Sequence, residues 1–504
     1  MSTGSETTTG TAPDAGAPRR VAVVGAGPAG VFTADALVRA ADAAGPVSVD
    51  LLERLPAPFG LVRYGVAPDH PRIKRIITAL SKLLARGDIR LLSNVELGAD
   101  LALSDLRQLY DAVVLTTGAN RDAALPVPGV DLPGSYGAAD FVAWYGGHPD
   151  GPRSWPLDAA HVAVVGAGNV ALDVSRMLVR RAEDLLSTDV PDAVHAALAA
   201  SAVTDVHVLA RRGPAQARFS AMELRELGEV AGLDVVVDPA DLELDDASRA
   251  AAEASRDTQH VLDALAHLAG LPLTGATRRL HLHFWRRPVR FLGPDAVSGV
   301  ELERTEPSAD GRAAGTGELS VLPVQAVYRA VGYRGSPVPG VPFDEAAAVV
   351  PNHEGRVLGP GGDVVPGLYA SGWIKRGPVG LIGHTKSDAA ETVASLAADL
   401  PGLPRAPHPE PEAVTDLLQR RGVRCVDWSG WMLLDAFERE LGAAVGRERI
   451  KVADREEMLR AALRAAEAAP DAAGPGAPGH APGSLDSAYR LRSARAHERT
   501  RRCC

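Results

Sequence analysis

Short apolar runs recur along the chain, and a glycine-rich turn and a helix-like segment follow the most regular of them. The first run, Val21–Val24, has no polar position, which is typical of a strand buried on both faces of a parallel sheet. A helix-like segment, Val31 to Ala41, comes after it. Buried strands that alternate with helices predict an α/β fold with parallel sheets.

The turn between this strand and this helix contains Gly25, Gly27, Pro28, Ala29 and Gly30. In a dinucleotide-binding loop the first glycine allows the tight turn, the second lets the backbone approach a pyrophosphate, and the third lets helix and strand pack closely. The free N–H groups at the helix start then attract the phosphates. Because glycine triplets also occur in ordinary turns, this loop alone leaves both interpretations open.

A second strand is predicted at Val47–Glu53, and it ends in an acid. Glu53 lies about 20 residues beyond the last glycine, the spacing at which a carboxylate accepts hydrogen bonds from ribose hydroxyls. An acid here favours an unphosphorylated ribose, as in FAD or NAD, over that of NADP. The alternative is a solvated acid at the end of a strand.

The strand–loop–helix pattern returns at His161–Val179, where Gly166, Gly168 and Ala171 repeat the spacing of the first loop. Two such loops, each after a buried strand, indicate two nucleotide-binding units. The second unit differs at its ribose position, where the strand-like segment Asp205–Arg212 ends in two arginines.

These arginines, Arg211 and Arg212, occupy the position that corresponds to Glu53. Guanidinium groups bind phosphate oxygens with a fixed fork of donors, and such residues accommodate the 2′-phosphate of NADP. An exposed basic turn is the alternative. We therefore interpret the first nucleotide as FAD and the second as NADP.

Two further segments combine apolar residues with glycines, as expected of a surface that lies against a flat cofactor. Phe59–His70 is expected to be irregular, and its His70 precedes the helical run Pro71–Ala85, so that helix capping is the alternative role. Gly367–Thr385 leads from a short strand into a helix. Its Trp373 is expected against a cofactor face, with a core position as the alternative.

Composition excludes several functions. The formal net charge of −10 argues against bulk nucleic-acid binding, and no apolar run is long enough to span a bilayer. The cysteines, Cys425, Cys503 and Cys504, form no CxxC pair near a glycine loop, so neither a disulfide reductase nor an iron–sulfur centre is expected. We expect no metal centre. Residues 1–18 lack the features of a secretion signal or transit peptide, which predicts a cytoplasmic protein. We also expect a monomer.

The later part of the chain offers candidate docking segments. His281–Arg290 is expected to be one strand whose three arginines either meet an acidic protein or stay solvated. After a proline-rich linker, Pro401–Pro411, we expect two amphipathic helices and a disordered basic tail, with the helices near Trp431–Val445 and Arg455–Ala468.

In chain order, the sequence contains VVGAGPAG, FGLVRYGVAPDHP, GNVALDV, LARRGP, MELREL, VGYRG and SGWIKRGPVGLIG. In these motifs it resembles the ferredoxin–NADP⁺ reductases of the adrenodoxin reductase type. The resemblance implies two Rossmann-like (three-layer) dinucleotide-binding domains, with the NADP domain inserted into the FAD domain. It implies an FAD-binding domain at 19–117 and 335–468, an NADP-binding domain at 118–334, and disordered tails at 1–18 and 469–504.

The resemblance also implies the residues of each site. FAD would be held by Gly25, Gly27, Pro28, Ala29, Gly30, Glu53, Leu61, Leu97, Trp373, Gly380, Leu381 and Ile382. NADP would be held by Gly168, Asn169, Val170, Ala171, Leu172, Arg211, Arg212, Glu223 and Gly380. His70 and Asp173 correspond to polar groups near the flavin and are the expected catalytic residues.

The implied reaction carries electrons from NADPH through FAD to a ferredoxin-type iron–sulfur protein. Two alternatives stay open. One is a flavin-dependent NADPH oxidoreductase (a diaphorase or monooxygenase) that acts on a small molecule, and the other is a non-catalytic subunit that binds flavin or NADP.

The sequence departs from the family pattern at His384, where a small or hydroxyl residue is expected, and at Asp234–Thr277, which lacks the basic cluster that some relatives use for their partner. The identity of the ferredoxin and its docking surface therefore stay open.

Overall fold

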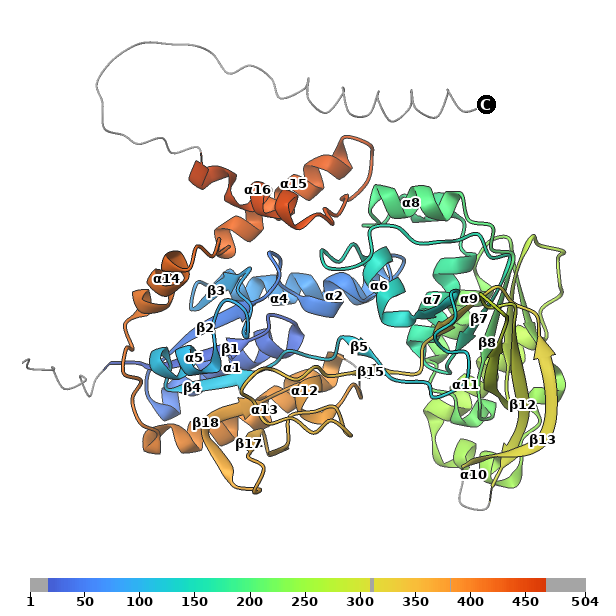
Figure 1. The fold of residues 1–504 in the computed structure, drawn as a ribbon, viewed down its shortest axis with the longest axis horizontal. Coiled ribbons are helices and arrows are strands. Elements are labelled where there is room, and N and C mark those ends of the chain that lie inside the picture. The colour runs from blue at the N-terminus through green and yellow to red at the C-terminus, as the bar shows by residue number, and fades with distance from the viewer. Residues whose placement is uncertain (1–16, 309–311, 381, 468–504) are drawn as a thin grey trace, which may run out of the picture. The chain divides into compact units, whose positions relative to one another are not determined.

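The computed structural model describes residues 17–467 except 309–311 and 381. Its first sheet has seven strands (Figure 1), in the order β16 (Asn352–His353), β17 (Arg356–Leu358), β18 (Val364–Ala370), β4 (Ala112–Leu115), β1 (Arg19–Val24), β2 (Val47–Glu53) and β3 (Ile89–Ser93). The strands from β18 to β3 are parallel, whereas β16, β17 and β18 pair antiparallel at one edge. The carboxyl ends of β1 and β2 therefore lie side by side and bring the first glycine loop close to Glu53.

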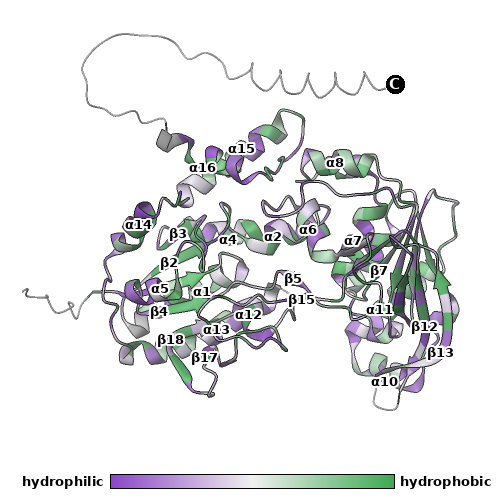
Figure 2. Cartoon of the chain, in the orientation of Figure 1, coloured by the Kyte–Doolittle hydropathy of each residue, from purple (hydrophilic) through white to green (hydrophobic). Residues whose placement is uncertain are grey.

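Helices cover both faces of this sheet, because its central strands are apolar on both sides. Val21 and Val23 of β1 pack into one apolar core, and Ala22 and Val24 pack into another on the opposite face. The flanking helices are α1 (Pro28–Ala44), α2 (Gly60–Tyr64), α3 (Pro71–Lys74), α4 (Ile76–Leu84), α5 (Leu103–Leu109), α12 (Trp373–Arg376) and α13 (Ile382–Asp399). Figure 2 shows the same contrast, with the central strands hydrophobic and helices such as α14 (Pro411–Arg420) largely hydrophilic.

The second sheet has six parallel strands, in the order β6 (Ser135–Gly137), β14 (Ala326–Arg329), β7 (His161–Val165), β8 (Asp205–Leu209), β10 (Arg278–His283) and β9 (Leu233–Val237). Helices pack on one face of it: α6 (Ala138–Gly146), α7 (Asn169–Val179), α8 (Asp192–Ala199), α9 (Ala221–Gly228) and α11 (Arg256–Ala269). Helix α10 (Asp246–Ala254) packs against α11. The short 3₁₀ helices η1 (Ala182–Leu185), η2 (Pro214–Gln216) and η3 (Pro239–Leu242) join these elements. The other face packs on an antiparallel sheet of β11 (Arg286–Leu292), β12 (Gly299–Pro307) and β13 (Ala313–Leu322).

The chain leaves the first sheet and returns to it through β5 (Arg121–Asp122) and β15 (Tyr333–Arg334), which pair antiparallel. The second sheet is thus built from residues between two parts of the first, which confirms the expected α/β fold with one dinucleotide-binding unit inserted into the other. The boundaries at 117/118 and 334/335 stay a prediction. After η4 (Leu400–Gly402), the chain continues into α14, α15 (Trp428–Ala443) and α16 (Arg455–Glu467).

Three segments differ from the sequence-based expectations. Phe59–His70 contains the short helix α2, which starts after Phe59 takes a left-handed conformation with φ of 84°. His281–Arg290 is not one strand, because a turn at Trp285 with φ of 56° divides it between β10 and β11 of different sheets. Helix α14 was not expected after the proline-rich linker. Of the predicted tails at 1–18 and 469–504, residues 1–16 and all of 469–504 lie outside the described residues. No helix of the described residues is long and apolar enough to cross a membrane.

Candidate functional site

The first glycine loop is shaped by close backbone packing. Gly25 has φ of +110°, and a Cβ added there would lie 2.7 Å from the carbonyl oxygen of Thr116. A Cβ at Gly30 would overlap the carbonyl oxygen of Gly25, so the helix can approach the strand only because this position is glycine. Around Gly27, by contrast, nothing lies within 4 Å of an added Cβ. The loop therefore leaves open space at the one glycine where a pyrophosphate has to approach the backbone.

Glu53 is buried at the end of β2, with 7% of its surface exposed. Its carboxylate accepts hydrogen bonds from the backbone N–H groups of Ala26 at 2.8 Å and Leu55 at 3.0 Å. Burial raises the pKa of Glu53, and these hydrogen bonds partly oppose the shift. Since a carboxylate has about four lone-pair sites, Glu53 keeps acceptor capacity for a ribose. The alternative of a solvated acid is wrong, and the environment fits an unphosphorylated nucleotide.

A cavity of about 550 Å³ runs from the first glycine loop to the segment around Trp373. The predicted residues that line it are Gly25, Gly27, Pro28, Ala29, Glu53, Leu61, Leu97, Trp373 and Gly380. Its walls are mostly apolar, as a flat ring system requires. Trp373 lines this cavity and does not belong to any of the apolar cores of the described residues. Of the remaining predictions, Ile382 starts α13 and Leu381 lies outside the described residues.

The sequence-based analysis missed several residues of this cavity. Thr116 directly follows β4, and its single hydroxyl hydrogen is shared between the carbonyl oxygens of Val24 at 2.9 Å and Gly25 at 2.8 Å. Pro337 and Pro339 reach the cavity from a loop that follows β15. The small-residue turn at the end of β4 was a signal for Thr116, whereas nothing in the local sequence pointed to the prolines.

The second glycine loop has the same design. Gly166 has φ of +151°, and a Cβ there would overlap the carbonyl oxygen of Ala330, while nothing lies within 4 Å of a Cβ at Gly168. Helix α7 begins at Asn169 without a side-chain cap, so its first N–H groups are available to phosphate oxygens. Ala171 and Leu172 are fully buried and hold the helix against the sheet. The Asn169 side chain accepts a hydrogen bond from Ser220 N at 2.8 Å.

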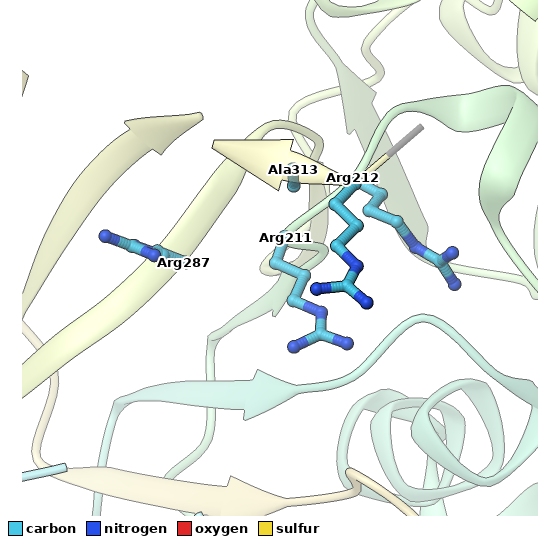
Figure 3. A pocket seen from close by; sticks show the side chains of 5 residues that line it. Arg211, Arg212, Arg287 and Ala313 are labelled. Atoms are coloured by element: carbon cyan, nitrogen blue, oxygen red, sulfur yellow. The ribbon is translucent and has the colours of Figure 1, made fainter. Parts of the chain in front are cut away.

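Arginines gather next to the second loop. Arg211, Arg212, Arg287, Arg312 and Ala313 line a cavity of about 270 Å³. In Figure 3 the side chain of Arg287, on β11, extends away from Arg211 and Arg212. Burial and the neighbouring charges of Arg211 and Arg218 lower the pKa of Arg212. Neither Arg211 nor Arg212 forms an ion pair with another described residue. Two guanidinium groups held close together without a carboxylate partner among the described residues fit a phosphate group, so the arrangement of Arg211 and Arg212 favours the predicted 2′-phosphate contact over an ordinary basic turn.

His70 joins the two units through a buried network of charges. The histidine is 4% exposed, and its Nε2 lies 3.0 Å from Asp173 Oδ1 and 3.5 Å from Glu223 Oε2. Its Nδ1 lies 3.4 Å from Glu226 Oε2. Although His70 precedes α3, its side chain makes no capping hydrogen bond. His70 is thus the N-cap residue of α3 by its backbone, whereas its side chain serves the charge network.

The charge state of His70 follows from its neighbours. Burial alone lowers the pKa of His70, but hydrogen bonds to Asp173 and Glu223 raise it to about 9. Arg176 lies against the same ring nitrogen and opposes this shift, yet three carboxylates outweigh one guanidinium. His70 is thus protonated at neutral pH.

The network brings together residues that the sequence separates widely. Asp173 comes from α7, and Glu223, which the resemblance assigns to the NADP site, lies 3.5 Å from both His70 and Arg176. Arg176 also binds Asp173 at 2.6 Å and Asp69 at 2.5 Å. Sequence analysis did not identify Arg176, because its helical position looks like that of any buried or solvated arginine until the partners are known.

Comparisons with known proteins agree with this geometry. Residues 19–378 match the family model of the pyridine nucleotide-disulphide oxidoreductases. The chain is 41% identical over 464 residues to the mitochondrial NADPH:adrenodoxin oxidoreductase of Arabidopsis thaliana, which covers 88% of this chain and 95% of that one. It is 40% identical over 461 residues to the NADPH-ferredoxin reductase FprA of Mycobacterium tuberculosis, with coverage of 88% and 99%.

A solved structure gives the same result. The structure of Mycobacterium tuberculosis FprA in complex with NADPH is 40% identical to this chain and superposes with a TM-score of 0.84. The alignment covers 89% of this chain and 100% of that one. The family match at 19–378 contains both glycine loops, Glu53, both arginines and the His70 network.

Proposed function

Because this chain belongs to the ferredoxin–NADP⁺ reductases of the adrenodoxin reductase type, we propose that it transfers electrons from NADPH through FAD to a ferredoxin-type iron–sulfur protein. The observation that carries the proposal is the difference between the two glycine loops. A buried acid stands at the ribose position of the first, and two arginines without an ion-pair partner among the described residues stand at that of the second. One chain thus offers both an unphosphorylated and a 2′-phosphorylated dinucleotide site.

The residues around the first loop would hold FAD. The open space at Gly27 suits the pyrophosphate, Glu53 suits a ribose, and the apolar cavity with Leu61 and Trp373 suits the ring system. When bound, the flavin supplies the change from two-electron to one-electron transfer, which no side chain can perform. The chain accordingly needs neither a redox cysteine nor a nucleophile in this region.

The residues around the second loop would hold NADP(H). Arg211 and Arg212 bind the 2′-phosphate, and the N–H groups at the start of α7 bind the pyrophosphate. Protonated His70, held by Asp173 and Glu223, keeps a positive charge where the two units meet. We assign His70 and Asp173 to the positioning of groups at this junction, with the network excluding bulk water from it.

The proposal is tested by steady-state electron transfer with the purified full-length chain. NADPH-dependent reduction of [2Fe–2S] or [3Fe–4S] ferredoxins is measured beside NADPH oxidation by oxygen and by small quinones, with NADH as the matched control. Ferredoxin reduction that exceeds the other reactions supports the proposal. Turnover with oxygen or quinones only indicates a diaphorase or monooxygenase, and a bound flavin that NADPH cannot reduce indicates a non-catalytic subunit.

We also propose that the protein is a cytoplasmic monomer. Light scattering after size-exclusion chromatography measures the mass of the particle in solution, and cell fractionation locates the chain. A stable dimer would contradict the first statement, and recovery from a membrane or organelle fraction would contradict the second.

A further inference from the structure

A segment that follows β8 runs alongside the second glycine loop. Arg218 N donates a hydrogen bond of 2.7 Å to the carbonyl oxygen of Ala167, and Arg218 forms a parallel β-bridge with Gly168. Two residues further on, Ser220 N donates a hydrogen bond of 2.8 Å to Asn169 Oδ1. The backbone of Arg218 is thus attached both to the loop and to the first residue of α7, so its position does not depend on a bound nucleotide.

The β-bridge determines the face from which the Arg218 side chain departs. Residues that lie opposite each other in a bridge carry their side chains on the same face. Gly168 has only a hydrogen on that face, and nothing lies within 4 Å of a Cβ added to it. The side chain of Arg218 therefore starts beside the open space that the loop leaves for a pyrophosphate, and its flexible stem lets the guanidinium reach into this space.

The guanidinium of Arg218 is available to a ligand. Arg218 is exposed, and within the part of the chain that the structure describes its side chain makes neither an ion pair nor a hydrogen bond. Burial, the charge of Arg211 and the charge of Arg218 lower the pKa of Arg212, so the three arginines lie in one region of the second unit. A positive region of this kind beside a glycine loop attracts an anionic ligand.

The first glycine loop has a corresponding neighbour that carries no charge. Phe59 N donates a hydrogen bond of 2.8 Å to the carbonyl oxygen of Ala26, the residue between the first two glycines of that loop. Arg218 N makes the same bond to Ala167. The Phe59 side chain is fully buried, and its ring packs edge-on against Trp431 with 5.7 Å between the ring centres. The same backbone contact therefore presents an apolar residue in the first unit and a cation in the second.

We propose that Arg218 binds the pyrophosphate of NADP(H). The inference rests on the NADP(H) site proposed above and adds a residue that acts on a different phosphate from Arg211 and Arg212. A guanidinium offers a planar fork of donors to phosphate oxygens, and the N–H groups at the start of α7 supply further donors. Because NADPH and NADH share the pyrophosphate, Arg218 contributes to the affinity for both nucleotides, whereas Arg211 and Arg212 select between them.

The assignment is tested by titration calorimetry on the flavin-loaded full-length chain with NADP⁺ and 2′-AMP, of which only NADP⁺ contains a pyrophosphate. Arg218→Ala is expected to weaken NADP⁺ binding by about 10-fold and to leave 2′-AMP binding unchanged. Arg218→Lys keeps the charge but not the fork of donors, so it should weaken NADP⁺ binding by only about 3-fold. The matched control, Arg181→Ala, also removes an exposed arginine of the second unit. It follows the far end of α7, roughly 16 Å from the loop, and should leave both affinities unchanged.

Steady-state kinetics provide a second readout, in which Arg218→Ala should raise KM for NADPH and for NADH by the same factor and leave kcat unchanged. Equal losses of NADP⁺ and 2′-AMP binding, or a rise of KM with NADPH alone, would assign Arg218 to the 2′-phosphate and overturn the proposal. Wild-type affinity of the Arg218→Ala variant for NADP⁺ would overturn it as well. A wild-type chain that does not bind NADP⁺ would contradict the proposed NADP(H) site itself, and the role of Arg218 with it.

Discussion

The two glycine loops have similar backbone conformations but differ in the side chains at their ribose positions. In each loop the first glycine has a positive φ and touches a neighbouring strand, and the second faces open space. The first unit then presents a buried acid that two backbone N–H groups already hold, and the second presents arginines that no described carboxylate neutralises. The loop geometry therefore determines that a dinucleotide binds, and the residue at the end of the next strand determines which one.

The largest expected effect comes from removing the arginines of the second unit. Arg211→Ala with Arg212→Ala is expected to lower kcat/KM for NADPH by about 100- to 1000-fold, since hydrogen bonds to charged groups contribute about 1.5–3 kcal/mol each. NADH lacks the 2′-phosphate, so its kcat/KM should change little. Steady-state rates with both nucleotides measure the ratio. Equal losses with NADPH and NADH would contradict the assignment of these arginines to the 2′-phosphate.

The two units meet at His70, and this contact predicts a dependence of stability on pH. The pKa of His70 is raised from 6.5 to about 9 in the folded chain, so protonated His70 stabilises the fold fully below pH 6.5. As pH rises through 9 this contribution, about 3 kcal/mol, is lost. The difference in unfolding free energy between wild type and His70→Gln should therefore shrink between pH 6.5 and 9.5. Urea unfolding at several pH values measures it, and a constant difference would rule out the charged histidine.

A matched pair of substitutions compares the second glycines of the loops. Gly27 has φ of −69° and Gly168 has φ of −129°, which alanine adopts without strain, and neither position has an atom within 4 Å of an added Cβ. Since no other described residue lies within 4 Å of the added methyl, we expect it to meet the pyrophosphate that each loop would bind. Gly27→Ala is expected to lower FAD affinity, and Gly168→Ala to raise KM for NADPH, each by roughly 10-fold. Flavin content and NADPH kinetics separate the two effects, and a loss of thermal stability in either variant would show that the space is not open.

The sequence predicted the parts of these units that are local in the chain. Strand, glycine loop and helix follow one another within each unit, so the positions of Gly25 and Gly166 could be recognised from spacing alone. Glu53 and Arg211, the residues expected at the two riboses, could also be recognised, because each follows the strand that comes after its glycine loop and helix. The α/β fold and the inserted second unit followed from the repeat and from the family resemblance.

The parts that the sequence did not predict depend on contacts between distant segments. The network around His70 needs a helix from the second unit to place Arg176 beside a histidine of the first, which no local pattern encodes. The hydrogen bond between His207 and His283 depends on the parallel register of β8 and β10. The expected strand at His281–Arg290 failed for a similar reason, because tertiary packing turns the chain at Trp285 and overrides the local preference.

The smallest expected effect concerns Arg287, which lines the same cavity as Arg211 and Arg212 but comes from β11. Glu303 already pairs with Arg287, with Oε2 2.7 Å from Nε, and neutralises much of its charge. A half-exposed pair of this kind contributes about 0–1 kcal/mol, so Arg287→Ala should raise KM for NADPH by only about two- to five-fold. Glu303→Gln frees the guanidinium and should lower KM instead. Opposite shifts of KM in the two variants would place Arg287 within reach of the nucleotide. An unchanged KM in both variants would limit recognition of the 2′-phosphate to Arg211 and Arg212, which follow β8.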